Sequence, residues 1–168
     1  MSKNFTIETI TPENYREASV SPDQIADFLH EHLDRFRDPR EQIMNCLEYA
    51  LGIVEHRRGF ILAAFEGTPG QHAGAAGSEG STGDHGKLLG VVVSCETGMS
   101  GYIPENLLVY IAVDASTRGR GIGKSLMEQA IQNADGDVAL HVEPDNPAKR
   151  LYERIGFTNK YLEMRFKK

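Results

Sequence analysis

The segment from Leu107 to Lys124, LLVYIAVDASTRGRGIGK, constrains the fold more than any other part of the chain. Its first part, Leu107–Val113, is an uncharged run of Leu, Val, Tyr, Ile and Ala. A run of this length is too short for an independent helix and is typical of a strand buried on both faces. From Gly121 onward, apolar residues recur at the spacing of one helix face. The segment therefore predicts a buried strand, a short polar turn and an amphipathic helix.

The end of this turn is suited to hold a phosphate group. Around Ile122, it combines three glycines, Gly119, Gly121 and Gly123, with three cationic residues, Arg118, Arg120 and Lys124. Glycines let backbone N–H groups approach a ligand closely. The first turn of the following helix leaves N–H groups unpaired, and its dipole adds partial positive charge. We predict a phosphate or diphosphate site here; an ordinary turn with solvated arginines is the alternative.

Two common phosphate loops do not fit this turn. The nucleoside-triphosphate loop G-x-x-x-x-G-K-[ST] matches GKS at Gly123–Ser125, but its first glycine would fall on Arg118. The dinucleotide pattern G-x-G-x-x-G is partly met by Gly119 and Gly121, but the third glycine comes one residue early. A nucleotide-binding switch that uses GKS therefore stays only as an alternative function.

The turn instead resembles the [Q/R]-x-x-G-x-[G/A] signature of the GNAT superfamily of N-acetyltransferases. Arg118, Gly121 and Gly123 stand at the fixed positions of that signature. A second stretch, NPAKRLYERIGF at Asn146–Phe157, is similar to the family's N-x-x-x-x-x-Y-x-x-x-G-F arrangement. The two matches follow the family's order with a predicted strand between them, so together they are more specific than either glycine loop.

The resemblance implies a single α/β N-acetyltransferase domain over residues 1–168. Its sheet is expected to be mixed and mostly antiparallel, with a splayed parallel pair of central strands and helices on its faces. The sequence predicts strands at Phe5–Ile10, Phe60–Phe65, Leu88–Cys95, Leu107–Val113, Val138–Val142 and Tyr161–Phe166. Helices are predicted to start at Ser21–Pro22, after Asp38–Pro39, at Gly121 and at Asn146–Pro147, the last ending at Gly156. The Gly-, Ala-, Ser- and Thr-rich stretch Gly67–Gly86 is predicted to be a flexible hairpin loop.

Composition agrees with one soluble domain, because the 168 residues are 40% hydrophobic and 25% charged. The amino terminus lacks an apolar signal core, and no apolar run approaches the roughly 20 residues of a membrane span, so a cytoplasmic location without membrane contact is expected. Cys46 and Cys95 are too few and too far apart for a disulfide framework, and we interpret them as reduced packing residues. The formal charge of −6 argues against a general nucleic-acid partner and permits a cationic acceptor such as an amine.

In the resembled family, acetyl-coenzyme A is the cosubstrate and its pantetheine arm lies between the splayed strands. Ile111, Ala112 and Val113 are then expected to offer backbone groups to that arm. The N–H groups from Arg118 to Lys124 would bind the diphosphate, and Asn146 would hold the arm or an ordered water from the opposite wall. No metal is expected, since no ligand pattern such as H-E-x-x-H is present. The resemblance thus implies direct transfer of acetyl to a primary amine.

Direct transfer leaves two proton tasks. A lysine-like amine has a pKa of about 10.4, so only about one molecule in a thousand is neutral near pH 7.4 and a base is needed. Glu105, just before the central strand, is the first candidate base and Glu143, after the neighbouring strand, is the second. His141 lies near the splay and stays open. Tyr152 occupies the family's general-acid position and would protonate the leaving thiolate, unless it only packs its helix.

The acceptor itself is not identified by any motif. In the resembled family the first helical pair shapes the acceptor pocket, which makes His30, His32, Phe36 and Arg37 candidates for contact. Isolated histidines on a helix are more often solvated or satisfied in a core. Small-molecule and peptide amines both stay open as acceptors, as does a homodimer. A coenzyme A-binding sensor or structural protein without turnover is the alternative function.

Overall fold

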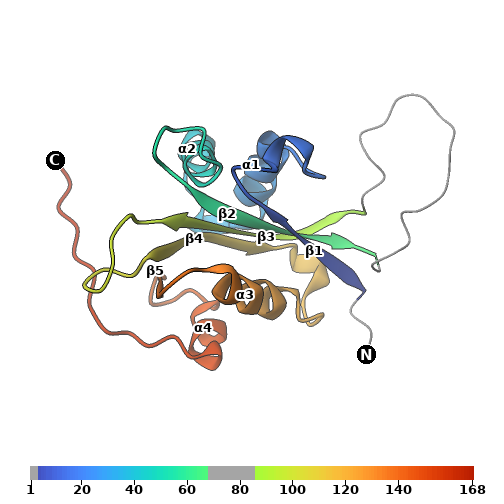
Figure 1. Cartoon of the computed structure of the whole chain (residues 1–168). Coiled ribbons are helices and arrows are strands. Elements are labelled where there is room, and N and C mark those ends of the chain that lie inside the picture. The colour runs from blue at the N-terminus through green and yellow to red at the C-terminus, as the bar shows by residue number, and fades with distance from the viewer. Residues whose placement is uncertain (1–3, 68–85) are drawn as a thin grey trace, which may run out of the picture.

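The computed structural model describes residues 4–67 and 86–168, which form a five-stranded sheet covered by helices on both faces (Figure 1). The elements are β1 (Phe5–Ile10), α1 (Pro22–His32), α2 (Arg40–Ala50), β2 (Gly59–Glu66), β3 (Leu88–Glu96), β4 (Asn106–Val113), α3 (Ile122–Asn133), β5 (Val138–Leu140) and α4 (Lys149–Ile155). Short 3-10 turns lie at Tyr15–Glu17, Asp34–Phe36 and Ala115–Thr117. The predicted element order is confirmed up to α4. The predicted flexible loop at Gly67–Gly86 lies outside the described residues apart from its two ends.

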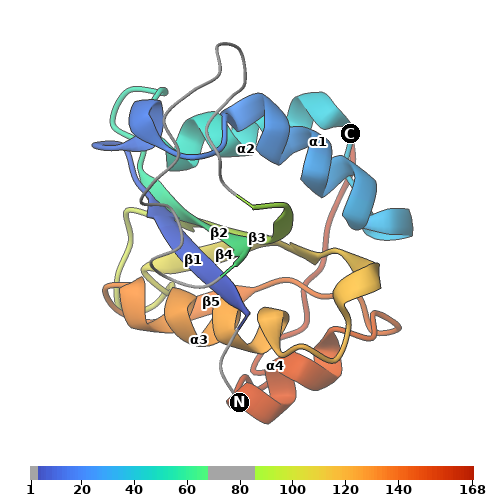
Figure 2. The same ribbon diagram turned by 90° about the vertical axis from the view of Figure 1, so that its right-hand side faces the viewer.

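The strands lie in the sheet in their chain order, from β1 to β5. Each of the first three strands pairs antiparallel with the next, whereas β4 and β5 are parallel. Helices α1 and α2 cover one face, while α3 and α4 cover the other (Figure 1 and Figure 2). This is the mixed, mostly antiparallel α/β arrangement that the sequence predicted. The parallel strands β4 and β5 are joined through α3, as expected for a strand–helix–strand crossover.

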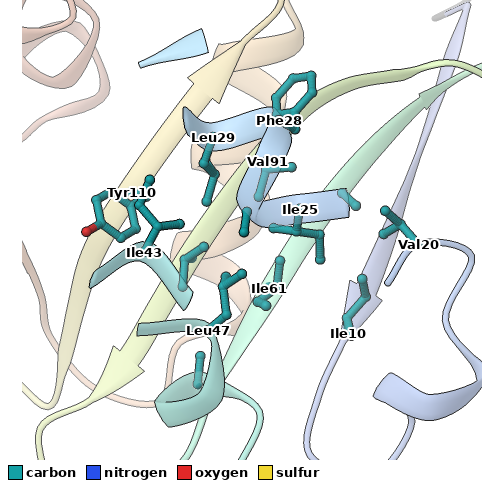
Figure 3. Close-up of a cluster of buried hydrophobic side chains, with 14 of the residues drawn as sticks. Ile10, Val20, Ile25, Phe28, Leu29, Ile43, Leu47, Ile61, Val91 and Tyr110 are labelled. Atoms are coloured by element: carbon teal, nitrogen blue, oxygen red, sulfur yellow. The ribbon is translucent and has the colours of Figure 1, made fainter. Parts of the chain in front are cut away.

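Each face of the sheet carries its own apolar core. On the α1/α2 face, Leu29 and Leu47 are fully buried against strand residues such as Val91 (Figure 3). On the α3/α4 face, Leu126 is equally buried in a cluster with Leu89. Because adjacent strand residues point to opposite faces, both faces can be apolar only if the strand sequence is continuously apolar. Strands β2 and β3 have this continuously apolar pattern, so both faces of the sheet must be covered by helices.

Helix α1 begins where its sequence predicts. The Ser21 hydroxyl accepts a hydrogen bond from the Gln24 amide at 3.2 Å, and the Gln24 side chain accepts one from the Ser21 amide at 2.9 Å. This reciprocal capping box satisfies two N–H groups that the helix would otherwise leave unpaired. Pro22 occupies the first turn, where its missing N–H costs nothing. Helix α2 likewise begins directly after Pro39, as predicted.

A β-bulge in β4 ends the pairing of the parallel strands. Val93 of β3 pairs with Tyr110 and Ser94 pairs with Leu108, so Val109 is an extra residue with no partner in that ladder. As a result, Leu108 and Tyr110 enter opposite cores although they are two residues apart. The pairing between β4 and β5 also stops at Leu108. Beyond the bulge, β4 continues along β3 without β5, which is the predicted splay.

Two element boundaries differ from prediction by two residues, and the other strand ends differ by at most one. Strand β5 ends at Leu140, two residues before the predicted Val142, because its pairing with β4 stops there. Helix α4 begins at Lys149, after a turn in which the Asn146 side chain accepts a hydrogen bond from the Ala148 amide at 2.9 Å. Asn146 therefore caps this turn ahead of the helix. The predicted helix end at Gly156 is confirmed by its left-handed φ of 118°.

The predicted final strand at Tyr161–Phe166 is wrong. This segment forms no strand, and its apolar side chains are exposed to 73% at Tyr161, 87% at Leu162, 92% at Met164 and 89% at Phe166. Alternating residues define two strand faces, but a strand also needs a neighbouring edge for its backbone groups. The adjacent β5 has only three residues, so it offers a very short edge.

Candidate active site

A groove lies between the β4–α3 turn, helix α3 and helix α4, with a volume of about 1170 Å³. It is lined by Val113, Thr117, Arg118, Gly119, Gly121, Ile122, Gly123, Lys124, Glu128, Ile131, Gln132, Pro147, Leu151, Arg154 and Ile155. The two sequence motifs therefore meet in space, because the glycine turn forms one wall and the α4 region forms the other. Of the residues predicted to bind a cosubstrate, Ile111, Ala112, Arg120, Asn146 and Tyr152 do not line it.

The glycine turn presents backbone N–H groups to this groove. Gly119 and Gly121 have φ values of +82° and +75°, in the left-handed region that favours glycine. A Cβ at either position would have no protein atom within 4 Å, so the backbone there faces open space. No side chain caps α3, and its first backbone hydrogen bond runs from the Ser125 amide to the Gly121 carbonyl. Among the described residues, the N–H groups of residues 122–124 have no acceptor and are available to an anion. The Arg118 and Arg120 amides, which were also predicted to bind the diphosphate, instead donate to the Ala115 and Thr117 carbonyls at 3.4 Å.

Three cationic side chains line the groove, and one of them was not predicted. Arg118 forms no ion pair within residues 4–67 and 86–168, and the Lys124 ammonium lies 3.6 Å from the Glu128 carboxylate. Arg154 adds a positive charge from α4. Its signal in the sequence is its spacing, since Leu151, Arg154 and Ile155 fall on one helix face and that face lines the groove.

The predicted cation Arg120 points elsewhere. Its guanidinium donates to the Glu66 carboxylate at 3.2 Å and to the Asn4 carbonyl at 3.1 Å. The side chain therefore ties the glycine turn to the β1–β2 end of the sheet. Sequence spacing could not separate Arg118 from Arg120, because the direction of each side chain depends on the turn's backbone.

Polar contacts of the buried Asp114 fix the start of the turn. The Asp114 carboxylate lies 2.6 Å from the Lys87 ammonium and accepts a hydrogen bond from the Ser116 amide at 2.9 Å. These two interactions, Lys87 first, hold the pKa of Asp114 well below its usual range. The Thr117 hydroxyl also donates to the Asp114 carbonyl at 2.7 Å. The backbone between β4 and the glycines is therefore fixed by polar contacts that the sequence did not reveal.

The unpaired edge of β4 leads into the groove. Ile111, Ala112 and Val113 pair with β3 on one side, whereas β5 has already separated on the other. Val113 at the end of the strand lines the groove. An extended chain lying along this edge could therefore pair with strand backbone and continue to the glycine turn.

Tyr152 is buried on α4 with an exposed fraction of 6%. Burial raises the pKa of its phenol to about 12, so the group is protonated at neutral pH. Its ring lies 6.1 Å from that of Phe157 in an edge-on arrangement, and its hydroxyl forms no hydrogen bond within the described residues. The environment therefore preserves a proton donor, although it also makes that donor a weaker acid than an exposed tyrosine.

The two predicted bases have different surroundings. The Glu105 carboxylate accepts hydrogen bonds from the Asp137 amide at 2.7 Å and the Gly101 amide at 3.3 Å, and these bonds lower its pKa. It thereby joins the loop before β4 to the turn before β5. Gly136 makes room for it, since a Cβ there would lie 2.6 Å from a Glu105 oxygen. Glu143, after β5, is exposed to solvent.

On the opposite face of the sheet, Tyr110 and Asp38 form a pair that the sequence reading missed. The Tyr110 hydroxyl donates to the Asp38 carboxylate at 2.6 Å, and Figure 3 shows that hydroxyl at the margin of the apolar cluster. Burial, with the Asp38 carboxylate second, raises the pKa of Tyr110. Nearby, the Arg35 guanidinium lies 2.9 Å from the Asp145 carboxylate. The α1–α2 connection is thus joined both to β4 just after the bulge and to the β5–α4 connection.

The residues predicted to touch an acceptor already have contacts with neighbouring residues of α1 and of the segment that follows it. The His32 ring lies 4.3 Å from the Phe28 ring, and the Arg35 guanidinium lies 4.7 Å from the centre of the Phe36 ring. Arg37 donates to the His30 carbonyl at 3.4 Å. Their contact with an acceptor stays a prediction.

Among residues 4–67 and 86–168, no group of three or more His, Cys, Asp or Glu side chains is placed to hold a metal ion. Within those same ranges, no helix has the length and apolar character to cross a membrane.

Comparison with known proteins connects this geometry to a family. The profile of the acetyltransferase (GNAT) domain matches residues 70–159. A search of curated proteins finds no match. The fold is similar to a ribosomal-protein-alanine N-acetyltransferase from Brucella melitensis biovar Abortus 2308, with a TM-score of 0.55, 19% identity and coverage of 97% of this chain and 99% of that one.

Two further solved structures have the same fold. An aminoglycoside N-acetyltransferase in complex with coenzyme A has a TM-score of 0.60 and 12% identity, covering 100% of this chain and 97% of its own. A GNAT family acetyltransferase from Streptococcus pneumoniae TIGR4 has a TM-score of 0.58 and 16% identity, with 98% of each chain covered. At these identities the likeness concerns the fold alone.

The two glycines at the start of α3 should respond differently to alanine. Gly121→Ala places a Cβ in a left-handed conformation and should lower the free energy of unfolding by about 1–2 kcal/mol. Gly123→Ala is the matched control: its Cβ would lie 3.5 Å from Leu151 and 3.6 Å from Val113, in ordinary contact. Because alanine favours a helix interior, this variant should be neutral or more stable by about 0.5–1 kcal/mol. Urea unfolding of both variants checks the difference, and equal losses would contradict the assigned backbone.

Proposed function

Because the chain belongs to the acetyltransferase (GNAT) family, and so to the N-acetyltransferases in general, we propose that it moves the acetyl group of acetyl-coenzyme A directly to a primary amine. One observation carries this proposal: the open edge of β4 runs into a turn with available N–H groups and adjacent cations. We further propose that residues 1–168 form one domain, active in the cytoplasm on a small-molecule or peptide amine without nucleic-acid or membrane partners.

The residues of the groove fit a diphosphate with an extended arm. The N–H groups at the start of α3 would hold the diphosphate, with Arg118, Lys124 and Arg154 supplying full positive charge. The backbone of Ile111–Val113 would pair with the amide-bearing arm as a neighbouring strand does. The side-chain nitrogen Nδ2 of Asn146, which has no partner within the described residues, would hold the arm from the other wall. When bound, the cosubstrate supplies a thioester whose acetyl carbon accepts the amine.

Removal of the amine proton is the first task for the protein. Glu143 is the more available of the two predicted bases, because Glu105 already accepts two backbone hydrogen bonds that lower its pKa. Asp38 is an additional candidate base on the α1/α2 face of the sheet, where the acceptor would bind. There the Tyr110 hydroxyl fixes one oxygen of the Asp38 carboxylate. Its exposed carboxylate would attract an ammonium ion and position it near the point where β4 and β5 separate.

Protonation of the leaving thiolate is the second task, and we assign it to Tyr152. With a pKa of about 12 against about 8.5 for an alkyl thiol, proton transfer from this phenol is unfavourable by about 3.5 pK units before a ligand binds. A thiolate beside the hydroxyl would be a hydrogen-bond partner that the phenol otherwise lacks. Tyr152 is thus suited to transfer its proton as the thiolate forms rather than earlier.

The diphosphate site can be tested by binding. Arg118→Ala should weaken coenzyme A binding by about 10- to 100-fold, the usual value of a charge-assisted hydrogen bond. Isothermal titration calorimetry should show no such loss for pantetheine, which lacks the diphosphate. Arg150→Ala is a matched control on exposed α4 surface outside the groove, and its affinity should change less than about twofold. Equal losses in both variants would indicate only a general effect of net charge.

The acid role of Tyr152 can be separated from binding. Tyr152→Phe keeps the ring and removes the proton donor, so kcat should fall by about 10²-fold while the Kd of coenzyme A stays within about twofold. Timed assays of thiol release measure kcat, and isothermal titration calorimetry measures the Kd of coenzyme A. Unchanged turnover would remove Tyr152 from the chemistry and leave it a packing residue.

Transfer itself is tested with a panel of amines and acetyl-coenzyme A. Polyamines, aminoglycosides, free amino acids, peptides and a lysine-bearing protein are compared by free-thiol release, and acetylated products are confirmed by mass. We expect at least one amine to raise thiol release about 10²-fold above the amine-free rate. Tight coenzyme binding without acetylation of any amine would support the sensor alternative. Thermal stabilisation by ATP with magnesium, but not by acetyl-coenzyme A, would instead support the nucleotide switch.

A further inference from the structure

Two cysteines that are far apart in the sequence lie in contact in the fold. Cys46 is on α2 and Cys95 is on β3, and their sulfur atoms are 3.8 Å apart. Cys95 is buried, with an exposed fraction of 8%, whereas Cys46 is partly exposed. Both lie on the α1/α2 face of the sheet, opposite the groove between α3 and α4.

The contact makes the two thiols chemically unequal. The sulfur–sulfur contact raises the pKa of Cys46 and lowers that of Cys95. The sequence contains no other cysteine, so neither thiol has a competing partner within the chain.

We propose that Cys46 and Cys95 form a reversibly oxidisable dithiol that closes to a disulfide between α2 and β3. The thiolate form of Cys46, the sulfur more open to solvent, attacks a hydroperoxide and becomes a sulfenic acid, while the hydroperoxide is reduced to the alcohol or water. The Cys95 thiolate then attacks the Cys46 sulfur, the sulfur–sulfur bond forms, and hydroxide leaves and is protonated to water. A small dithiol such as dithiothreitol reverses the reaction by thiol–disulfide exchange.

The geometry limits the movement that closure needs. The two sulfurs lie 3.8 Å apart before oxidation. A disulfide holds its sulfurs about 2 Å apart, so they must approach each other by roughly 2 Å. Rotation of the cysteine side chains with a small shift of α2 over the sheet supplies a displacement of this size. The bond would join residues 49 positions apart and so restrict the unfolded chain. The oxidised protein should therefore unfold at a temperature about 10 °C higher.

The test uses the full-length protein treated with hydrogen peroxide or diamide. We expect the intact mass to fall by two hydrogen atoms, peptide mapping to find Cys46 joined to Cys95, and the melting temperature to rise by about 10 °C. Dithiothreitol should reverse all three changes. Cys46→Ser and Cys95→Ser are the controls, and neither should show the mass loss or the thermal shift.

Peptide mapping of the oxidised protein without substitutions decides the proposal even if a serine variant folds poorly. Addition of oxygen to one or both thiols without a cross-linked peptide would overturn it, as would cross-links found only between two copies of the chain. The result is independent of acetyl transfer, because mass and melting temperature are measured without a cosubstrate.

Discussion

The separation of β4 from β5 is the constraint on which the arrangement of the site depends. Val109 is an extra residue in β4, and the parallel pairing stops one residue before it. Without this bulge, the backbone of Ile111–Val113 would be free to pair with a longer β5, and the edge that now leads to the groove would be closed. The bulge also turns Tyr110 toward the α1/α2 face, where it meets Asp38.

A second requirement is that the glycine turn keep its shape without a ligand. The turn contains two glycines with positive φ and no contacts above them, so its backbone would be mobile if glycine alone defined it. The Asp114–Lys87 pair and the Asp114–Ser116 hydrogen bond fix the chain just before those glycines. The flexible glycines therefore follow a segment that polar contacts hold rigid. The glycines let a ligand approach the backbone closely, and the rigid segment keeps the turn in a defined position.

The sequence predicted the elements well and the side-chain directions poorly. Strands and helices were found because their apolar periodicity is local, and Ser21 and Gly156 marked helix ends by their own chemistry. The prediction of a strand at Tyr161–Phe166 is wrong because a strand needs a neighbouring strand edge to pair with, and apolar periodicity does not show whether such an edge exists. Its position in the glycine turn makes Arg120 a predicted phosphate contact, and the family resemblance makes Glu105 a candidate base. Their partners, Glu66 and the Asp137 amide, come from distant segments.

The bond network of Arg120 links the outermost strand of the sheet to the glycine turn. This guanidinium joins Glu66 at the end of β2 and the carbonyl of Asn4 just before β1. Strands at a sheet edge open more readily than central ones, so fraying of β1 would release one restraint on the turn. By linkage, an anion held at the turn would slow hydrogen exchange in β1 amides on the far margin of the sheet.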